Sequence, residues 1–330
     1  LQGLIVVGIG TTIVGYFVIR SKYKIAIQNA YLAIVAFLGS LSILGMLQIG
    51  PLTRFLYKTS VSIRGEYWHA GWNMFKSSPI WGIGLDAYGD FYRRMREPSA
   101  LILPGVSTVT DMAHNVYIDI LASGGLLLFI PYIGIQVFVV KNSIAFLKKS
   151  KTYDPLFVSL FVGWVGYHAQ SLVSINQIGL AIWGWLFAGL LLAYIQISDT
   201  TTVVSQSAVK TKKNTSQELL PAVNYLTTIV MFSIALLIAL PPVISEKTWR
   251  TTLKSSKVEE IIQVTNKWPQ SNQRYIQTAQ ILLKSNLTAE CLTVVRNGIK
   301  FDPDFRDYWY FLYLLTSESK EKDLALQNLK

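Results

Sequence analysis

The residues best suited to chemistry in this chain of 330 residues lie in one stretch, DMAHNVYIDILASGG, residues 111–125. Asp111, His114, Asn115 and Asp119 form a polar edge that leads into an apolar segment. Asp111 lies where a helix N-cap is expected, and its carboxylate would orient the imidazole of His114 or raise its basicity. Ionisable groups at a membrane are costly and tend to mark functional sites, so we interpret the cluster as a site. The alternative is a capped helix start with an interfacial histidine.

Arg64 is the second candidate, and it begins a segment with a helical period, IRGEYWHAGWNMFKSSP. It lies four residues before Trp68 and therefore shares the apolar face, where its guanidinium needs an anion such as a lipid phosphate. We expect an aromatic helix in the membrane interface; an arginine that extends to water is the alternative for Arg64. The polar face holds Glu66, His69, Asn73 and Lys76, and we expect His69 to be solvated; the apolar face holds Trp68, Gly71, Trp72 and Phe75.

Two further groups are weaker candidates. Arg93 and Arg94 belong to a basic run with Arg96, which forms either a solvated face or a grip on phosphate or glycan. His168 lies in the polar segment YHAQSLVSINQ, on the same side of the membrane as His114, and either shares a polar chamber with it or packs as a hydrogen-bonded residue. The intervening segment SSPIWGIGLDAYGDFY is rich in turns and lacks a nucleotide-binding fingerprint.

The composition indicates a membrane protein, with 51% apolar and only 15% charged residues. The net charge of +11 is distributed in short basic clusters between apolar runs, which favours lipid headgroups over nucleic acid as partners. A single cysteine, Cys291, excludes a disulfide framework and a cysteine-ligated metal. The acids of the long loop are scattered, so we expect neither a metal ion nor a cofactor. Since Leu1 already lies in an apolar run, we expect a piece of a longer protein.

We predict an all-α, polytopic transmembrane bundle over residues 1–245. Six runs are long enough to cross a bilayer: about 1–19, 25–50, 113–140, 155–174, 178–197 and 221–244. Alternate gaps are basic: Arg20, Lys22 and Lys24; Lys141, Lys148, Lys149 and Lys151; Lys210, Lys212 and Lys213. The positive-inside rule makes these gaps cytoplasmic. The large loop 51–111, His114 and the tail after Ile244 then face outward.

The tail, residues 246–330, is predicted to be a soluble α-helical domain. It repeats weakly with a period of 34 residues, typical of tetratricopeptide hairpins, and a generic helical bundle is the alternative. The matched positions are Trp268-Pro269 with Asp302-Pro303, Tyr275 with Trp309, Ile281 with Leu315, and Cys291 with Ala325. The segment 198–220 is predicted to be a cytoplasmic loop without a stable fold.

Three segments in this order resemble the central signature of the O-antigen ligase and O-antigen polymerase superfamily. They are RGEYWHAGWNMF, PIWGIGLDAYGDF and AHNVYIDILASGGLLLF, and together they cover residues 64–129. The apolar flanks and the tail also resemble longer members, including bacterial oligosaccharyltransferases that glycosylate proteins. Members have about ten or more spans and use a further arginine from an earlier outer loop, both of which lie outside this sequence.

The resemblance implies a metal-independent glycosyltransferase on the outer face of the bacterial cytoplasmic membrane. Its donor would be a glycan on a polyprenyl diphosphate carrier, and its acceptor a lipid-anchored core, another glycan or a protein. By this resemblance His114 is the base that accepts the acceptor's proton, and Arg64 holds the diphosphate leaving group. Asn115 would hold the helix start or a sugar, and a single displacement would invert the anomeric carbon. The helical tail would recruit an acceptor protein or another enzyme.

Two other classes of protein compete with the enzyme. A transporter or flippase for lipid-linked sugars should show repeated halves with broken helices and charges deep in several spans. A scaffold anchored by its spans would leave Arg64 and the polar cluster at His114 unexplained. The polar residues concentrate at the outer ends of the spans, which favours chemistry at the membrane surface.

Overall fold

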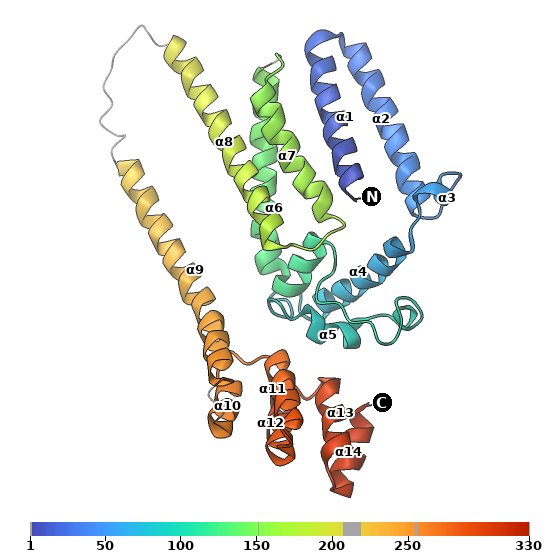
Figure 1. Cartoon of the computed structure of the whole chain (residues 1–330). Helices are drawn as coiled ribbons and strands as arrows, with labels where there is room; N and C mark the ends of the chain where they lie inside the picture. The colour runs from blue at the N-terminus through green and yellow to red at the C-terminus, as the bar shows by residue number, and fades with distance from the viewer. Residues whose placement is uncertain (1, 151, 207–218, 255–256, 330) are drawn as a thin grey trace. The chain divides into compact units, whose positions relative to one another are not determined.

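The structure, a computed structural model, describes residues 2–150, 152–206, 219–254 and 257–329. All regular elements in these residues are helices, so the predicted all-α fold is confirmed (Figure 1). The chain forms two compact units, residues 1–210 and 211–330. Five of the described helices are long and apolar enough to cross a membrane: Gly3–Lys22, Ile25–Met46, Val116–Lys149, Ile178–Ser198 and Tyr225–Thr252. The chain is therefore a polytopic membrane protein.

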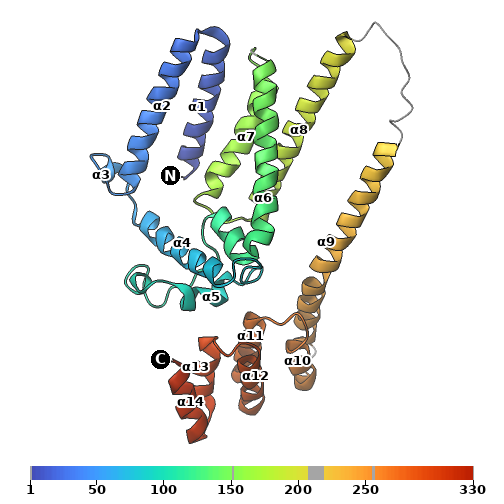
Figure 2. The same ribbon diagram turned by 180° about the vertical axis from the view of Figure 1, so that it is seen from behind.

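The first unit is a bundle of five long helices, seen from both sides in Figures 1 and 2. They are α1 (Gln2–Lys22), α2 (Ile25–Met46), α6 (Val116–Lys149), α7 (Pro155–Ser171) and α8 (Ile178–Gln206). α7 packs against both α1 and α8, and α8 also packs against α6. Aromatic side chains form much of the core between them, with Phe146 and Phe157 stacked at a centroid distance of 4.6 Å.

The predicted span at 155–174 corresponds to α7, which is not among the five long apolar helices. Its 17 residues lie at the short end of the range that crosses a bilayer. Asp154 fixes the start of α7, since its side chain accepts a hydrogen bond from the amide of Phe157, and Pro155 occupies the first turn. The helix ends at Ser171, before the polar segment that leads into α8.

Two of the predicted basic gaps lie at the same end of the bundle. The guanidinium of Arg20, at the end of α1, donates hydrogen bonds to the carbonyl oxygens of Leu147 and Ser150, at the end of α6. A cation at this position satisfies carbonyls that the helix end leaves free. His114 precedes the other end of α6, so the candidate site and these basic gaps are separated by the length of the helix.

The loop between α2 and α6 contains four helices. They are α3 (Thr53–Leu56), α4 (Thr59–Ser77), α5 (Tyr88–Met95) and the 3-10 helix η1 (Pro98–Leu101). α4 packs against α6 and α5, with Ala70 and Met74 fully buried. Part of the face predicted to lie in the membrane interface thus packs on protein: a side chain at Gly71 would contact Ile118, although Trp72 stays 48% exposed.

The second unit comprises α9 and five shorter helices. They are α9 (Leu219–Thr252), α10 (Val258–Thr265), α11 (Asn272–Lys284), α12 (Thr288–Phe301), α13 (Arg306–Leu315) and α14 (Ser319–Leu329). α11 and α13 begin at Asn272 and Arg306, 34 residues apart, and Cys291 and Ala325, at equivalent positions, are both fully buried. The helices match the predicted hairpins; their kinship with tetratricopeptide repeats stays a prediction.

The helices also correct two predicted boundaries. α8 continues to Gln206 and α9 begins at Leu219, so both ends of the predicted loop 198–220 are helical, and residues 207–218 lie outside the described residues. α9 continues to Thr252, so the predicted start of the tail at residue 246 lies within a helix. The boundary was predicted from the apolar run at 221–244, which covers only the part of α9 that could lie in a membrane.

Candidate functional site

The candidate site is built on a break in α6. Gly125 has φ 58° and ψ −161°, which interrupts the helix after its first two turns. The amides of Leu126 and Leu127 donate to the carbonyls of Pro79 and Ile80 (2.9 and 3.1 Å). The carbonyls of Ala122 and Ser123 accept from the amides of Ile83 and Gly84, both at 3.0 Å. The segment 79–84 is therefore inserted into the helix, and satisfies the backbone groups that the break exposes.

Glycine is required on both sides of this insertion. A Cβ atom at Gly82 would collide with the backbone of Ser123, and one at Gly125 with the carbonyl of Ile80. Both residues also have positive φ, where a side chain is strained. The Pro-x-x-Gly-x-Gly turn and the Gly pair of α6 are therefore two halves of one joint, which fixes the start of α6 against the preceding loop.

The polar cluster before α6 is held by Asn115 and Asp119. The side-chain oxygen of Asn115 accepts the amides of Tyr117 and Ile118 (3.0 and 3.2 Å), so Asn115 is the N-cap. A carboxylate oxygen of Asp119 accepts the amide of Ala113 at 3.1 Å. The predicted N-cap, Asp111, is wrong by four residues, because the helix begins at Val116; Asp111 is exposed and lies against Gly89 of α5.

His114 lies between these two anchors with φ 56°, a backbone conformation that few residues with side chains adopt. Its imidazole stacks on the ring of Tyr67 in α4, with a centroid distance of 5.4 Å and an interplanar angle of 29°. Burial, together with the charge of Arg64, lowers the pKa of His114. The prediction that Asp111 raises the basicity of this imidazole finds no support, since the pKa falls and the charge that acts on it is a cation.

Arg64 reaches the same place from the first turns of α4. Its charge acts on both Tyr67 and His114, lowering the pKa of each, although burial leaves the pKa of Tyr67 raised overall. Within the described part of the chain, its Nε atom is buried without a hydrogen-bond partner, and the side chain bonds only to Ser60 in its own helix, at 3.4 and 3.5 Å. The indole nitrogen of Trp68, one turn further on, is also buried and unpartnered.

The polar face of α4 is not simply solvated; it holds the loop that follows α5. Asn73 donates to the carbonyl of Met95 (2.9 Å) and to Glu97 (2.7 Å). Glu66 accepts a hydrogen bond from Ser99 at 2.8 Å. His69 is exposed, in agreement with the prediction.

The basic run of α5 has partners within its own loop. Arg94 lies over the ring of Phe91, with 4.3 Å between its guanidinium carbon and the ring centroid, and Arg96 donates to the carbonyls of Val106 and Thr108. Arg93 is half-buried on the same helix. The structure thus gives Arg94 and Arg96 roles in the loop, which do not exclude the predicted contact of Arg93 and Arg94 with a substrate.

His168 is joined to the start of α6, one turn beyond His114. Its Nδ1 atom lies 2.7 Å from the hydroxyl of Tyr117, while its Nε2 atom is buried without a partner. Its ring also packs edge-on against Trp164, at a centroid distance of 4.6 Å. This position fits the predicted packing residue and couples α7 to the first turn of α6.

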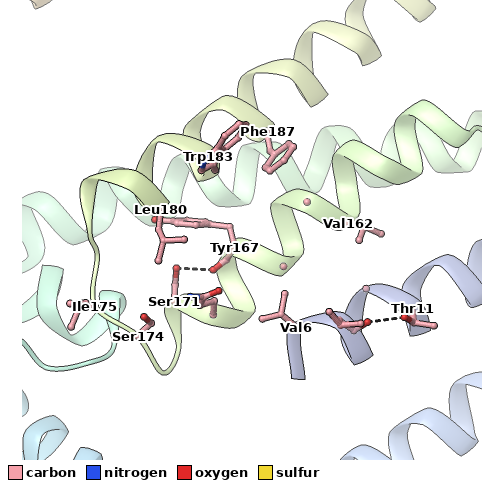
Figure 3. Close-up of a pocket in the computed structure, with 15 residues that line it drawn as sticks. Val6, Thr11, Val162, Tyr167, Ser171, Ser174, Ile175, Leu180, Trp183 and Phe187 are labelled. Carbon is pink, nitrogen blue, oxygen red and sulfur yellow. Dashed lines mark hydrogen bonds between the residues drawn. The ribbon is translucent and has the colours of Figure 1, made fainter. Parts of the chain in front are cut away.

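A pocket of about 480 Å³ lies between α1, α7 and α8 (Figure 3). Its walls are mainly apolar, with Val6 from α1, Val162 from α7, and Trp183 and Phe187 from α8. Ser171 contributes a hydroxyl, which bonds to the carbonyl of Tyr167 at 2.8 Å. His168 does not line this pocket, although it is next to Tyr167 in α7.

The structure brings together Arg64, His114 and Asn115 at one end of the bundle, and adds Tyr67 and Asp119 to them. Asp119 belongs to the polar cluster that the sequence predicted as a site, whereas Tyr67 was not predicted. Tyr67 stands three residues after Arg64, on the adjoining part of the same helix face, and this position was the one signal in the sequence. The described residues contain no group of three or more acids, histidines or cysteines that could hold a metal ion. Fold and site thus define a polytopic membrane protein in which Arg64, an arginine with an unpaired nitrogen, lies beside His114, a histidine with a lowered pKa.

Comparison with known proteins agrees with this class. Residues 2–133 match the family model described as O-Antigen ligase. The match confirms the resemblance to the O-antigen ligase and polymerase superfamily for this part of the chain, which holds Arg64, Tyr67 and His114, and supports glycan transfer as the general activity. Searches of curated proteins and of solved structures found no match.

Proposed function

We propose that this protein transfers a glycan from a polyprenyl diphosphate carrier to an acceptor hydroxyl, as O-antigen ligases do. The observation that carries the proposal is the pair of His114 and Arg64, with a lowered imidazole pKa and an unpartnered guanidinium nitrogen, in the family-matched region. We place the reaction on the outer face of the bacterial cytoplasmic membrane, the side on which the basic clusters of the sequence predict the loop between α2 and α6. It needs no metal ion.

His114 acts as the general base. An imidazole whose pKa lies below its ordinary value of about 6.5 is neutral near pH 7, so one nitrogen is free to accept a proton. The acceptor oxygen attacks the anomeric carbon while its proton passes to His114. The bond from that carbon to the diphosphate oxygen breaks with inversion, and the carrier diphosphate leaves with the bonding electrons.

Arg64 stabilises the negative charge that grows on the leaving diphosphate. A guanidinium is suited to this role because it is always charged and presents several N–H donors in one plane. The buried Nε of Arg64 and the indole N–H of Trp68 have no partner among the residues that the structure describes, although buried donors are normally satisfied. Two oxygens of the diphosphate would satisfy both donors.

The remaining predicted site residues either contact the substrates or support the site. Arg93 and Arg94 lie on α5 and contribute positive charge that binds the donor glycan or its diphosphate. Asp111 is exposed and would contact the acceptor. Asn115 and His168 act through the backbone and the helix packing that they stabilise. The pocket between α1, α7 and α8 is large and apolar enough to hold part of an isoprenoid chain.

Polymerase and protein oligosaccharyltransferase activities share this chemistry and differ in the acceptor. The tail helices would recruit an acceptor protein or a second enzyme. A flippase for lipid-linked sugars is the alternative from another class. It would not need a base, so it gives no role to the environment of His114.

The test is transfer by the full-length protein in membranes, supplied with a polyprenyl diphosphate glycan and a chelator. We expect His114→Gln and Arg64→Gln to abolish transfer. The matched controls His69→Gln, in the same helix as Arg64, and Arg54→Gln, in α3, should retain it, since both residues are exposed. Full transfer by His114→Gln would refute the proposed base, and loss of transfer on chelation would refute the metal-independent route.

A further inference from the structure

Tyr67 has no role in the reaction as proposed so far, yet its ring stacks on the ring of His114. We propose that Tyr67 is a positioning residue that holds the imidazole of His114 by stacking and keeps water from one of its faces. The inference rests on the proposed function for its catalytic meaning, while the stack itself is a property of the structure.

The ring of His114 needs such a support because no hydrogen bond among the described residues orients it. None of their hydrogen bonds involves either ring nitrogen of His114, so no carboxylate or carbonyl fixes its tautomer or its rotation. The backbone on either side is anchored, through Ala113 to Asp119 and through the cap at Asn115. A catalytic base is normally oriented by a third group; among the described residues, the one aromatic ring that stacks on His114 is that of Tyr67.

Tyr67 is in turn held from behind. The ring of Tyr92 packs edge-on against it, with a centroid distance of 5.7 Å and an interplanar angle of 77°. The hydroxyl of Tyr88 donates a hydrogen bond of 2.5 Å to the carbonyl oxygen of Tyr67. Tyr88 and Tyr92 are both fully buried, so the support extends into the core between α4, α5 and α6. A ring supported in this way can fix the position of a neighbour.

The stack also influences the protonation of His114. Covering one face of the ring removes water that would solvate the imidazolium, and desolvation is the largest cause of its lowered pKa, followed by the charge of Arg64. The titratable groups around it are Arg64 and Tyr67 from α4, Tyr88 and Tyr92 behind them in α5, and Asp111 and Asp119 in its own segment. The phenols are neutral near pH 7, since burial raises the pKa of Tyr67, of Tyr88 and of Tyr92, the last to about 12.

The test measures His114 directly, without any transferase assay. The full-length protein in membranes is labelled with diethyl pyrocarbonate from pH 5 to 8, and the label on each histidine is quantified by mass spectrometry. The label on the exposed His69 serves as the internal reference for the amount of reagent that reaches the protein. In the wild type we expect the midpoint of His114 labelling to lie below about 6.5, the ordinary value of a histidine. Tyr67→Leu should move it upward, toward about 6.5, and the conservative Tyr67→Phe should restore the wild-type midpoint.

The labelling midpoint of His114 in the Tyr67 variants either supports or refutes the positioning role of Tyr67. An unchanged midpoint in Tyr67→Leu, with an unchanged melting temperature, would overturn the proposal. A shifted midpoint in Tyr67→Phe would also overturn it, because the hydroxyl would then act in place of the stack. If Tyr67→Leu fails to fold, Tyr67→Met fills similar space with a flexible side chain and makes the same test.

Activity measurements then separate this inference from the proposed function. In Tyr67→Leu we expect the acidic limb of the pH–rate profile to move by the same amount as the labelling midpoint, and kcat to fall by up to about 100-fold. If the labelling midpoint moves but no variant of His114 affects transfer, the stack stands and the proposed base is wrong. If transfer depends on His114 but the midpoint does not move, Tyr67 has no positioning role.

Discussion

Substitution of Gly125 by alanine should destabilise the first unit far more than an ordinary substitution in a helix. Gly125 has φ 58° and ψ −161°, a conformation that is essentially restricted to glycine. A methyl group there would also collide with the carbonyl of Ile80. Alanine must therefore either adopt the strained conformation or close the helix and expel the segment 79–84.

The cost follows from the contacts at the joint. The strained conformation costs about 2 kcal/mol. Expulsion of the segment would break four backbone hydrogen bonds, each worth about 1 kcal/mol net, although closure of the helix would recover some of them. We therefore expect a loss of about 2 to 4 kcal/mol in the free energy of unfolding, by whichever route is cheaper.

The matched control is Gly134→Ala, in the same helix. A Cβ atom at Gly134 would contact nothing within 4 Å, so this change should stabilise the helix by about 0.5–1 kcal/mol. Thermal unfolding of both variants in detergent, followed by fluorescence, measures the difference, and transfer activity should fall with Gly125→Ala alone. Equal melting temperatures for the two variants would refute the view that the break in α6 is a required joint.

Three further predictions concern the end of the bundle. The ratio kcat/KM should fall at acid pH with a midpoint below about 6.5, because burial and Arg64 lower the pKa of His114 and only its neutral form accepts a proton. The pH–rate profile of Arg64→Lys should have the same midpoint. A wild-type kcat/KM that still rises with pH up to pH 8 would contradict the assignment of His114 as the base. Trp68→Phe removes an unpartnered N–H and should raise KM for the glycan donor about tenfold, while substitution of the exposed Trp72 by phenylalanine should leave this KM unchanged in the same steady-state assay. Equal KM values for the two variants would show that the indole of Trp68 donates no hydrogen bond to the substrate. Asn115→Ala removes the cap of α6 and should lower the free energy of unfolding by about 1 kcal/mol, and no change in thermal unfolding would show that the cap is dispensable.

The sequence predicted the long helices well, because an apolar run of about 20 residues has few alternatives in a membrane. It could not predict the break in α6, since the segment ILASGGLLLF has the apolar character of an uninterrupted helix. The break becomes visible only when the segment 79–84, which supplies the missing hydrogen bonds, is placed beside it. Such a pairing depends on the three-dimensional course of the loop, which has no period in the sequence.

For the site, residue type was a better guide than residue spacing. Arginine and histidine near an apolar surface stand out because both are costly there, and the structure places Arg64 and His114 together. Asp111 was assigned wrongly as the cap, because Asp and Asn are both favoured caps and only the actual start of the helix decides between them. Tyr67 was missed because its position three residues after Arg64 does not distinguish it from the other aromatic residues of α4.

The joint in α6 and the stack on His114 belong to one structural arrangement. A base that is oriented by stacking, without a hydrogen bond to its ring, depends on how accurately α4 is placed relative to the start of α6. That placement is fixed on one side by the inserted segment 79–84, which directly follows α4. On the other side it is fixed by the hydrogen bonds of Asn115 and Asp119 to the backbone around His114. A variant that loosens the joint should therefore also raise the labelling midpoint of His114, although Gly125 itself does not contact the ring.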